Sequence, residues 1–91
     1  MTEETQIKKA VRDWLDWHGW FHFHLMAGMG VYPGAPDRIA VKGGRVVFLE
    51  IKAPGKNQSP AQYAFGMSIG KAGGEYHVIH DLDELETCLE R

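Results

Sequence analysis

Two acidic residues stand at the same end of a predicted hairpin, where together they could bind a metal ion. The run 37–42 and the apolar run 45–53 have strand composition, and the Gly-Gly pair between them is typical of a two-residue hairpin turn. Such a turn fixes the register, so that Asp37 lies directly opposite Glu50. Side chains of directly opposed residues project from the same face of a sheet, with Cβ atoms about 5 Å apart.

This pair of carboxylates needs either a proton or a positive partner. Two carboxylates about 5 Å apart repel each other by roughly 3 kcal/mol at an effective dielectric constant of 20, so one stays protonated or a cation binds both. A small set of oxygen ligands with open positions suits Mg²⁺ or Mn²⁺. Lys52, on the same strand face as Glu50, adds a cationic group suited to phosphoryl chemistry. The alternative is a surface ion cluster without catalytic function.

A helix, a strand and a long loop are expected before the hairpin. Apolar residues recur at helical spacing up to Gly19, where the pattern ends. Apolar residues and histidines alternate over 20–25, which predicts a strand whose wetter face holds His22 and His24. The run 27–36 is rich in Gly and Pro and forms a long loop for so small a chain, which favours a functional role.

The second half of the chain continues the alternation of strand and helix. Ser59 is the expected N-cap of a helix that extends to about Lys71, the run 75–80 has strand composition, and Asp81 begins a final helix. A crossover helix between the third and fourth strands makes those two strands parallel. The sequence therefore predicts an α/β fold of order α-β-β-β-α-β-α, with a mixed central sheet flanked by helices in one domain, 1–91.

The composition is that of an ordinary folded protein. Hydrophobic residues make up 44% and charged residues 24% of the chain. No apolar run reaches the roughly 18 residues of a membrane helix, and the N-terminus lacks the pattern of a secretory signal. The lone Cys88 excludes an internal disulfide framework and a cysteine-based zinc site. We therefore expect a cytoplasmic protein with no membrane partner and no organic cofactor.

The formal net charge of −2 does not by itself indicate a nucleic-acid partner. Acidic residues gather in 81–91, which leaves a weakly basic remainder that permits phosphate contacts. The loop 26–36 and a set of basic residues could surround a nucleic-acid backbone, although each such residue is more often a solvated surface charge. That set is Lys42, Arg45, Lys56 and Lys71.

The motif residues resemble a known nuclease signature. Pro36-Asp37 followed by Glu50-Ile51-Lys52 resembles the PD-(D/E)XK signature of restriction-endonuclease-like nucleases, and the surrounding pattern is similar to the VRR-NUC (virus-type replication-repair nuclease) family over about residues 4–85. The further shared features are Glu4-Thr5-Gln6-Ile7, a Gly shortly before Pro-Asp, Pro54-Gly55 after Glu-x-Lys, Ser59-Pro60-x-Gln62, and Gly73-Gly74.

The resemblance implies a DNA endonuclease that depends on Mg²⁺ or Mn²⁺. Asp37 and Glu50 would match the family's metal-binding carboxylates, and the carbonyl of Ile51 would be a third ligand. Lys52 would match the lysine that positions and activates the attacking water. This assignment suits phosphodiester hydrolysis, which needs an in-line water and stabilisation of charge on the phosphate and on the leaving oxygen.

The resemblance also implies supporting residues outside the hairpin. Gln62 would match the family's glutamine on the following helix, and Glu4 would match the acidic residue of the first helix, with Glu3 as an adjacent competitor. His22 and His24 stand where related sequences often have Arg or Asn, a departure that concerns the DNA-contacting face. These histidines could also be half of a zinc site, but no third ligand lies near them in the sequence.

Stand-alone members of the resembled family act as homodimers on branched DNA such as four-way (Holliday) junctions in DNA repair, and the resemblance implies the same here. Two symmetric cuts need two sites related by a two-fold axis, which a dimer provides. The alternatives are a flap or duplex DNA nuclease, and a non-cleaving DNA-binding module with the same fold. Gly66 and Gly70, within the helix after Ser59, predict a close approach of that helix to the sheet or to another helix.

Overall fold

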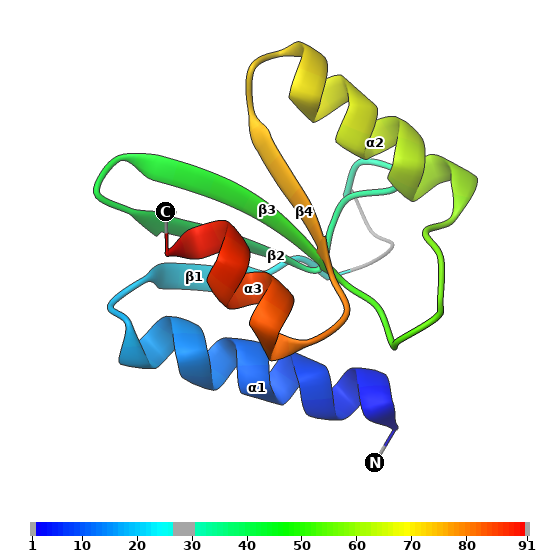
Figure 1. Cartoon of the computed structure of the whole chain (residues 1–91). Coiled ribbons are helices and arrows are strands. Elements are labelled where there is room, and N and C mark those ends of the chain that lie inside the picture. Colours follow the sequence, from blue (N-terminus) through cyan, green and yellow to red (C-terminus); the bar gives the residue numbers. More distant parts are fainter. Residues whose placement is uncertain (1, 27–30, 91) are drawn as a thin grey trace.

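The computed structural model describes residues 2–26 and 31–90, so residues 27–30 of the predicted loop lie outside the described part. Its elements follow the predicted order (Figure 1). They are α1 (Glu3–Trp17), β1 (Phe21–His24), β2 (Arg38–Lys42), β3 (Arg45–Ile51), α2 (Pro60–Lys71), β4 (Glu75–Ile79) and α3 (Leu82–Leu89). The sheet has the order β1-β2-β3-β4, antiparallel from β1 to β3 and parallel between β3 and β4. The predicted mixed sheet of an α/β fold is confirmed.

The hairpin between β2 and β3 has the predicted register. Gly43 and Gly44 have φ angles of 58° and 83°, as a turn with two left-handed central residues requires. Lys42 pairs with Arg45, and the ladder continues in step from there. The sequence pattern therefore determined this pairing through the two turn residues.

The ladder ends one residue earlier than predicted. Its last pair is Arg38 with Leu49, and Asp37 lies in a bend just before β2. The Oδ2 atom of Asp37 accepts a hydrogen bond from the backbone N–H of Ile51, at 2.7 Å. Asp37 therefore lies beside β3, as predicted. It is held there by a side-chain hydrogen bond to Ile51, and the predicted backbone pairing of Asp37 with Glu50 is not formed.

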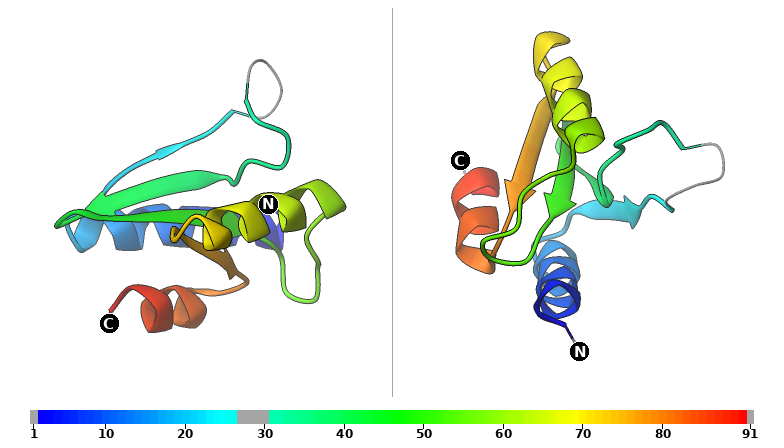
Figure 2. Two further views of the ribbon diagram at one scale, coloured as in Figure 1. Left: turned by 90° about the horizontal axis from the view of Figure 1, so that it is seen from above. Right: turned by 90° about the vertical axis from the view of Figure 1, so that its right-hand side faces the viewer.

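The core lies between one face of the sheet and the helices α1 and α3. Alternate residues of β2, β3 and β4 point to this face and meet the apolar sides of the two helices. On the opposite face, Phe65 of α2 packs against Phe48 and Tyr76, and Figure 2 shows α2 and α3 on either side of β4. The buried apolar residues are Val11, Trp14, Leu15, Trp20, Ala40, Val47, Leu49, Ile51, Ile79, Leu85 and Leu89.

The prediction for the two faces of β1 was wrong for Phe21, Phe23 and His22, whereas His24 is exposed, as expected of the wetter face. Phe21 and Phe23 are 68% and 41% exposed, whereas the side chain of His22 is only 8% exposed. The cause is the placement of the helices. Because β1 is an edge strand and α2 lies over the other edge of the sheet, against β4, none of the helices in the described part of the chain covers the phenylalanine face of β1. α1 packs on the histidine face, where Asp16 bonds His22.

Two glycines permit close approaches to α2. A Cβ atom at Gly66 would lie 2.9 Å from the Tyr76 ring, so the predicted close approach is confirmed there. A Cβ atom at Gly70 would meet nothing within 4 Å, so the same prediction was wrong for Gly70. Gly34, with φ +80°, lies so close to the start of α2 that a Cβ atom would sit 2.1 Å from the carbonyl oxygen of Ala61. The loop that leads to Asp37 is thus seated directly on α2.

We predict opposite effects for the same substitution at two of these glycines. Gly34→Ala should lower the free energy of unfolding by about 2 kcal/mol or more, because alanine disfavours a positive φ and its methyl group would collide with backbone. Gly70→Ala should raise it by about 0.5–1 kcal/mol through helix propensity. Urea unfolding followed by circular dichroism measures both, and equal changes would contradict the seating of the loop on α2.

Candidate active site

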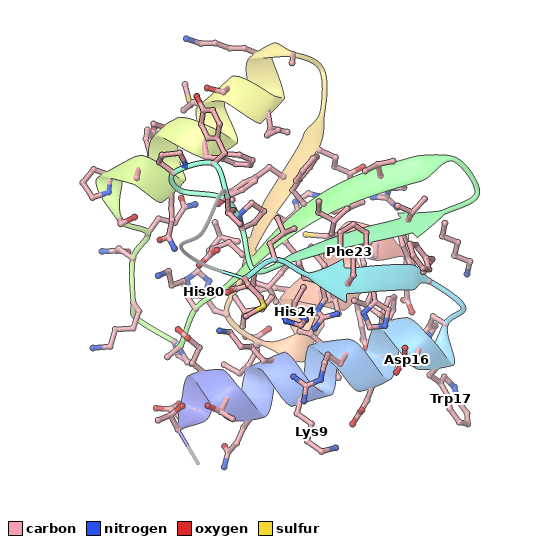
Figure 3. All side chains as sticks on the ribbon, turned by 180° about the vertical axis from the view of Figure 1, so that it is seen from behind. Lys9, Asp16, Trp17, Phe23, His24 and His80 are labelled. Atoms are coloured by element: carbon pink, nitrogen blue, oxygen red, sulfur yellow. The ribbon has the colours of Figure 1, made fainter. Side chains whose placement is uncertain are left out.

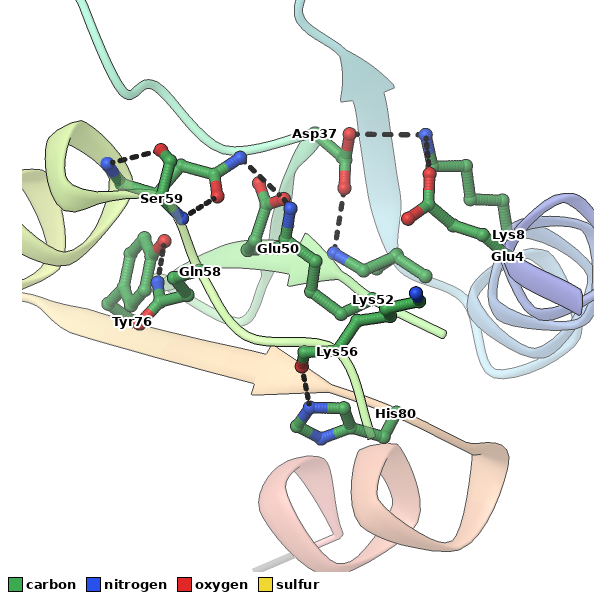
Figure 4. Close-up of polar contacts among 12 residues, drawn as sticks. Glu4, Lys8, Asp37, Glu50, Lys52, Lys56, Gln58, Ser59, Tyr76 and His80 are labelled. Atoms are coloured by element: carbon green, nitrogen blue, oxygen red, sulfur yellow. Dashed lines mark hydrogen bonds and ion pairs between the residues drawn. The ribbon is translucent and has the colours of Figure 1, made fainter. Parts of the chain in front are cut away.

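The predicted site residues of the hairpin, Asp37, Glu50 and Lys52, lie close together at the C-terminal end of the central strand β3 (Figure 4). Glu50 is only 3% exposed, although it bears a carboxylate. Its Oε2 atom accepts a hydrogen bond from Nε2 of Gln62 at 2.9 Å and lies 3.7 Å from Nζ of Lys52. The backbone N–H of Lys52 bonds to the carbonyl of Ile79 at 3.0 Å, which continues the pairing with β4 and keeps Lys52 beside Glu50. Asp37 lies next to this group.

Gln62 is oriented by the first turn of α2. Its Oε1 atom accepts a hydrogen bond from the backbone N–H of Ser59, while the Ser59 hydroxyl accepts one from the backbone N–H of Gln62. This reciprocal arrangement is a capping box. Because the oxygen of the amide is used by the cap, the NH₂ group must point the other way, toward Glu50. The cap of α2 therefore supplies a hydrogen-bond donor to the site.

Burial and charge change the protonation of Glu50. The pKa of Glu50 is raised to about 7, because burial and, after it, the charge of Asp37 outweigh the opposing effects of Lys52 and Lys8. The predicted repulsion between the two carboxylates is thus present. With a pKa near neutrality the carboxyl is about half ionised at pH 7, and a cation bound beside it would shift it to the ionised form.

Glu4 reaches the site through another residue. Nζ of Lys8 lies 3.4 Å from Oε2 of Glu4 and 3.3 Å from Oδ1 of Asp37. Burial lowers the pKa of Lys8, but attraction and hydrogen bonding to Asp37 and Glu4 outweigh this effect, so its pKa is raised. Lys8 is a site residue that was not predicted from the sequence. Its position four residues after Glu4, on the same face of α1, is the feature that could have revealed it.

The uncharged side chain of Tyr76 lies near Glu50. Its hydroxyl oxygen accepts a hydrogen bond from Nε2 of Gln58 at 2.7 Å. Burial, followed by the charge of Glu50, raises the pKa of Tyr76 to about 12, so the phenol stays protonated at physiological pH. This environment contributes to the low polarity around Glu50.

The donor set fits a hard divalent cation. Asp37 and Glu50 offer carboxylate oxygens side by side (Figure 4), and the peptide of Ile51 lies at Asp37. Across residues 2–26 and 31–90, no cluster of three or more His, Cys, Asp or Glu side chains is arranged to hold a metal. Backbone oxygen and solvent would therefore complete the coordination, as is usual for Mg²⁺.

Some of the residues that were predicted to contact nucleic acid lie away from the end of β3 that holds Glu50. Lys42 and Arg45 flank the hairpin turn at the far end of β2 and β3. Lys42 donates to the carbonyl of His18, and Arg45 bonds Glu75. These contacts hold structural elements together at a distance from the candidate site, and the expectation that the two residues help to surround a nucleic-acid backbone stays a prediction. The prediction that His22 is a solvated or DNA-facing residue was wrong, because α1 covers it.

The structure is similar to a solved structure described as a "VRR_NUC domain". The TM-score is 0.85 with 21% sequence identity, and the alignment covers 100% of this chain and 98% of that chain. This likeness confirms the predicted restriction-endonuclease-like fold. No protein-family model and no curated protein matches the sequence. None of the helices in the described part of the chain has the length and apolar character needed to cross a bilayer.

We predict that Glu50 makes stability depend on pH in the metal-free protein. Its carboxyl binds a proton more tightly in the folded chain, where its pKa is about 7, than in the unfolded chain, where the ordinary value is 4.5. The resulting stabilisation is complete below pH 4.5 and is lost as the pH rises through about 7.

The matched variant is Glu50→Gln, which keeps the shape of the side chain and cannot ionise. In EDTA, the free energy of unfolding of the wild type should fall relative to this variant by about 3 kcal/mol between pH 4.5 and pH 8. Denaturant titrations at a series of pH values measure the difference. Parallel pH profiles would show that Glu50 is not in the environment described.

Proposed function

We propose that this protein is a Mg²⁺- or Mn²⁺-dependent DNA endonuclease of the VRR-NUC family that cuts branched DNA as a homodimer. The observation that supports this most strongly is the group formed by Asp37, the nearly buried Glu50 and Lys52 at one edge of the sheet. The likeness of fold to a solved VRR_NUC domain adds support. The resemblance of Pro36-Asp37 and Glu50-Ile51-Lys52 to the PD-(D/E)XK signature implies that these residues bind the metal and act in catalysis.

The proposed chemistry is phosphodiester hydrolysis. A divalent ion held by Asp37, Glu50 and the carbonyl of Ile51 would polarise the phosphate and lower the pKa of a bound water. Nζ of Lys52 lies 3.7 Å from Oε2 of Glu50, and Lys52 would orient the attacking water and offset negative charge in the transition state. Gln62 keeps Glu50 aimed at the site through its hydrogen bond. Glu4 is a positioning residue that acts through Lys8.

An apolar surface supports the proposed homodimer. Phe21, Phe23 and Val46 are exposed on one face of the sheet, and the register places Phe21 and Val46 in one row through Val41. A strip of this kind can bury itself against an identical strip related by a two-fold axis. A dimer would present two sites, which suits two symmetric cuts in a four-way junction.

We predict that Lys52→Ala abolishes cleavage and leaves the fold intact. The rate of plasmid nicking with Mn²⁺ should fall about 10²–10⁴-fold, as expected for loss of a group that acts on the nucleophile. Lys9→Ala removes the same charge from an exposed position of α1, where Lys9 pairs with Asp13, and is the matched control. Far-ultraviolet circular dichroism checks the fold of both variants.

The same assay separates the alternatives. Wild-type protein that binds DNA without cutting it in Mg²⁺ or Mn²⁺ would indicate a non-cleaving binding module. Labelled four-way junction, flap, fork and linear duplex substrates identify the preferred DNA, and paired symmetric cuts in the junction support the proposal. A preference for flaps, or for linear duplex at a fixed sequence, would replace the proposed preference for branched DNA.

Calorimetry with Mn²⁺ tests the proposed metal site. It should show binding of the ion by the wild type and loss of that binding in Asp37→Asn.

We predict that the homodimer depends on the apolar strip. Light scattering after gel filtration should give a dimer for the wild type and a monomer for the double variant Phe21→Ser/Val46→Ser. Trp17→Ser changes another exposed apolar residue, 87% exposed and outside the strip, and should leave the dimer intact. A wild-type monomer at all concentrations, or a dimer unaffected by the double variant, would exclude this interface.

A further inference from the structure

A positively charged pocket lies directly beside the candidate active site. It has a volume of about 420 Å³ and is bounded by α1, β1 and β2. Lys8 and Arg12 of α1, His24 of β1 and Arg38 of β2 line it, together with the single carboxylate Asp37. Asp37 accepts a hydrogen bond from Ile51, and both residues line the pocket, so the pocket adjoins the end of β3 that holds Glu50.

The positive charges in the pocket are only partly balanced. Lys8 is paired with Asp37, but Arg12 has no ion-pair partner among residues 2–26 and 31–90, and the hydrogen bond of Arg38 goes to the His22 ring instead of a carboxylate. Two guanidinium groups that repel each other at one opening form a site that favours an anion.

Arg38 is held in place by a chain of polar contacts. Its Nη1 atom lies 2.8 Å from Nδ1 of His22, and Nε2 of His22 contacts Oδ1 of Asp16. Since a guanidinium can only donate, Nδ1 accepts, and Nε2 bears the proton that it donates to Asp16. The largely buried imidazole thus fixes the guanidinium at the pocket before any ligand arrives.

We propose that this pocket binds a backbone phosphate of the DNA strand, next to the phosphate that is cleaved at Asp37 and Glu50, and this rests on the proposed function. A nucleic-acid strand has one negative charge per nucleotide at short, regular intervals, so a strand bound at the cleavage site brings neighbouring phosphates close to it. Guanidinium groups match phosphate oxygens with paired hydrogen bonds. Arg12 and Arg38 would therefore set the position of the strand.

The test compares two substitutions on the same helix. Arg12→Gln removes a charge from the pocket, and Lys9→Gln removes one from an exposed position of α1 where Lys9 pairs with Asp13 (Figure 3). Binding of a labelled four-way junction is measured by fluorescence anisotropy in EDTA between 50 and 200 mM KCl. Arg12→Gln should raise Kd at least about 5-fold and reduce the slope of log K against log salt by about 1. Lys9→Gln should change Kd less than about 2-fold.

A second experiment assigns the phosphate. Neutral methylphosphonate linkages are placed one at a time within three nucleotides of the cleaved bond. At one position the neutral linkage should weaken binding by the wild type as much as Arg12→Gln does, with no further loss when the two changes are combined. Arg38→Gln should show the same coupling. Its thermal unfolding is measured alongside, because Arg38 also contacts His22.

The outcomes distinguish this proposal from the proposed function. A wild-type protein that cuts DNA while Arg12→Gln behaves like Lys9→Gln overturns the phosphate pocket and leaves the nuclease assignment standing. Additive losses at every methylphosphonate position overturn it as well. A wild-type protein that neither binds nor cuts DNA overturns both proposals.

Discussion

The cost of burying the carboxylate of Glu50 is the constraint on which the site depends. An ionised carboxylate removed from water is unfavourable unless hydrogen bonds and positive charge compensate it. Here Gln62 donates one hydrogen bond, Lys52 lies 3.7 Å away, and the adjacent charge of Asp37 works against ionisation. The balance leaves the group close to half-protonated at neutral pH, so it responds strongly to any cation that binds at this edge.

Three segments far apart in the sequence converge to create this balance. The hairpin turn fixes the register that places Glu50 near Asp37. The capping box of α2 orients the side chain of Gln62, and α1 brings Lys8 to Asp37. The loop before Asp37 is fixed to α2 by the close approach of Gly34 to Ala61. A shift of any one segment would change the charge environment of the two carboxylates. Local folding and site chemistry are therefore linked through a few backbone contacts.

Features encoded by neighbouring residues could be predicted from the sequence. The two turn glycines gave the hairpin register, and Ser59 with Gln62 gave a capped helix next to the site. The exposed face of β1 could not be predicted, because it depends on α2 lying against β4 instead of over β1. Lys8, Arg12 and Arg38 were likewise missed. Their proximity follows from how α1 lies across the sheet, and no local pattern specifies that packing.

Net charge illustrates the same limit. The chain has a formal charge of −2, which gives no reason to expect a polyanionic partner. The structure separates the charges: acidic residues lie along α3, whereas Lys8, Arg12 and Arg38 line one pocket beside Asp37. At physiological salt, exposed charges interact over about 8 Å, so a phosphate experiences the local cluster far more than the sum over the molecule. A small acidic protein can thus present a positively charged surface where a nucleic-acid strand would need to lie.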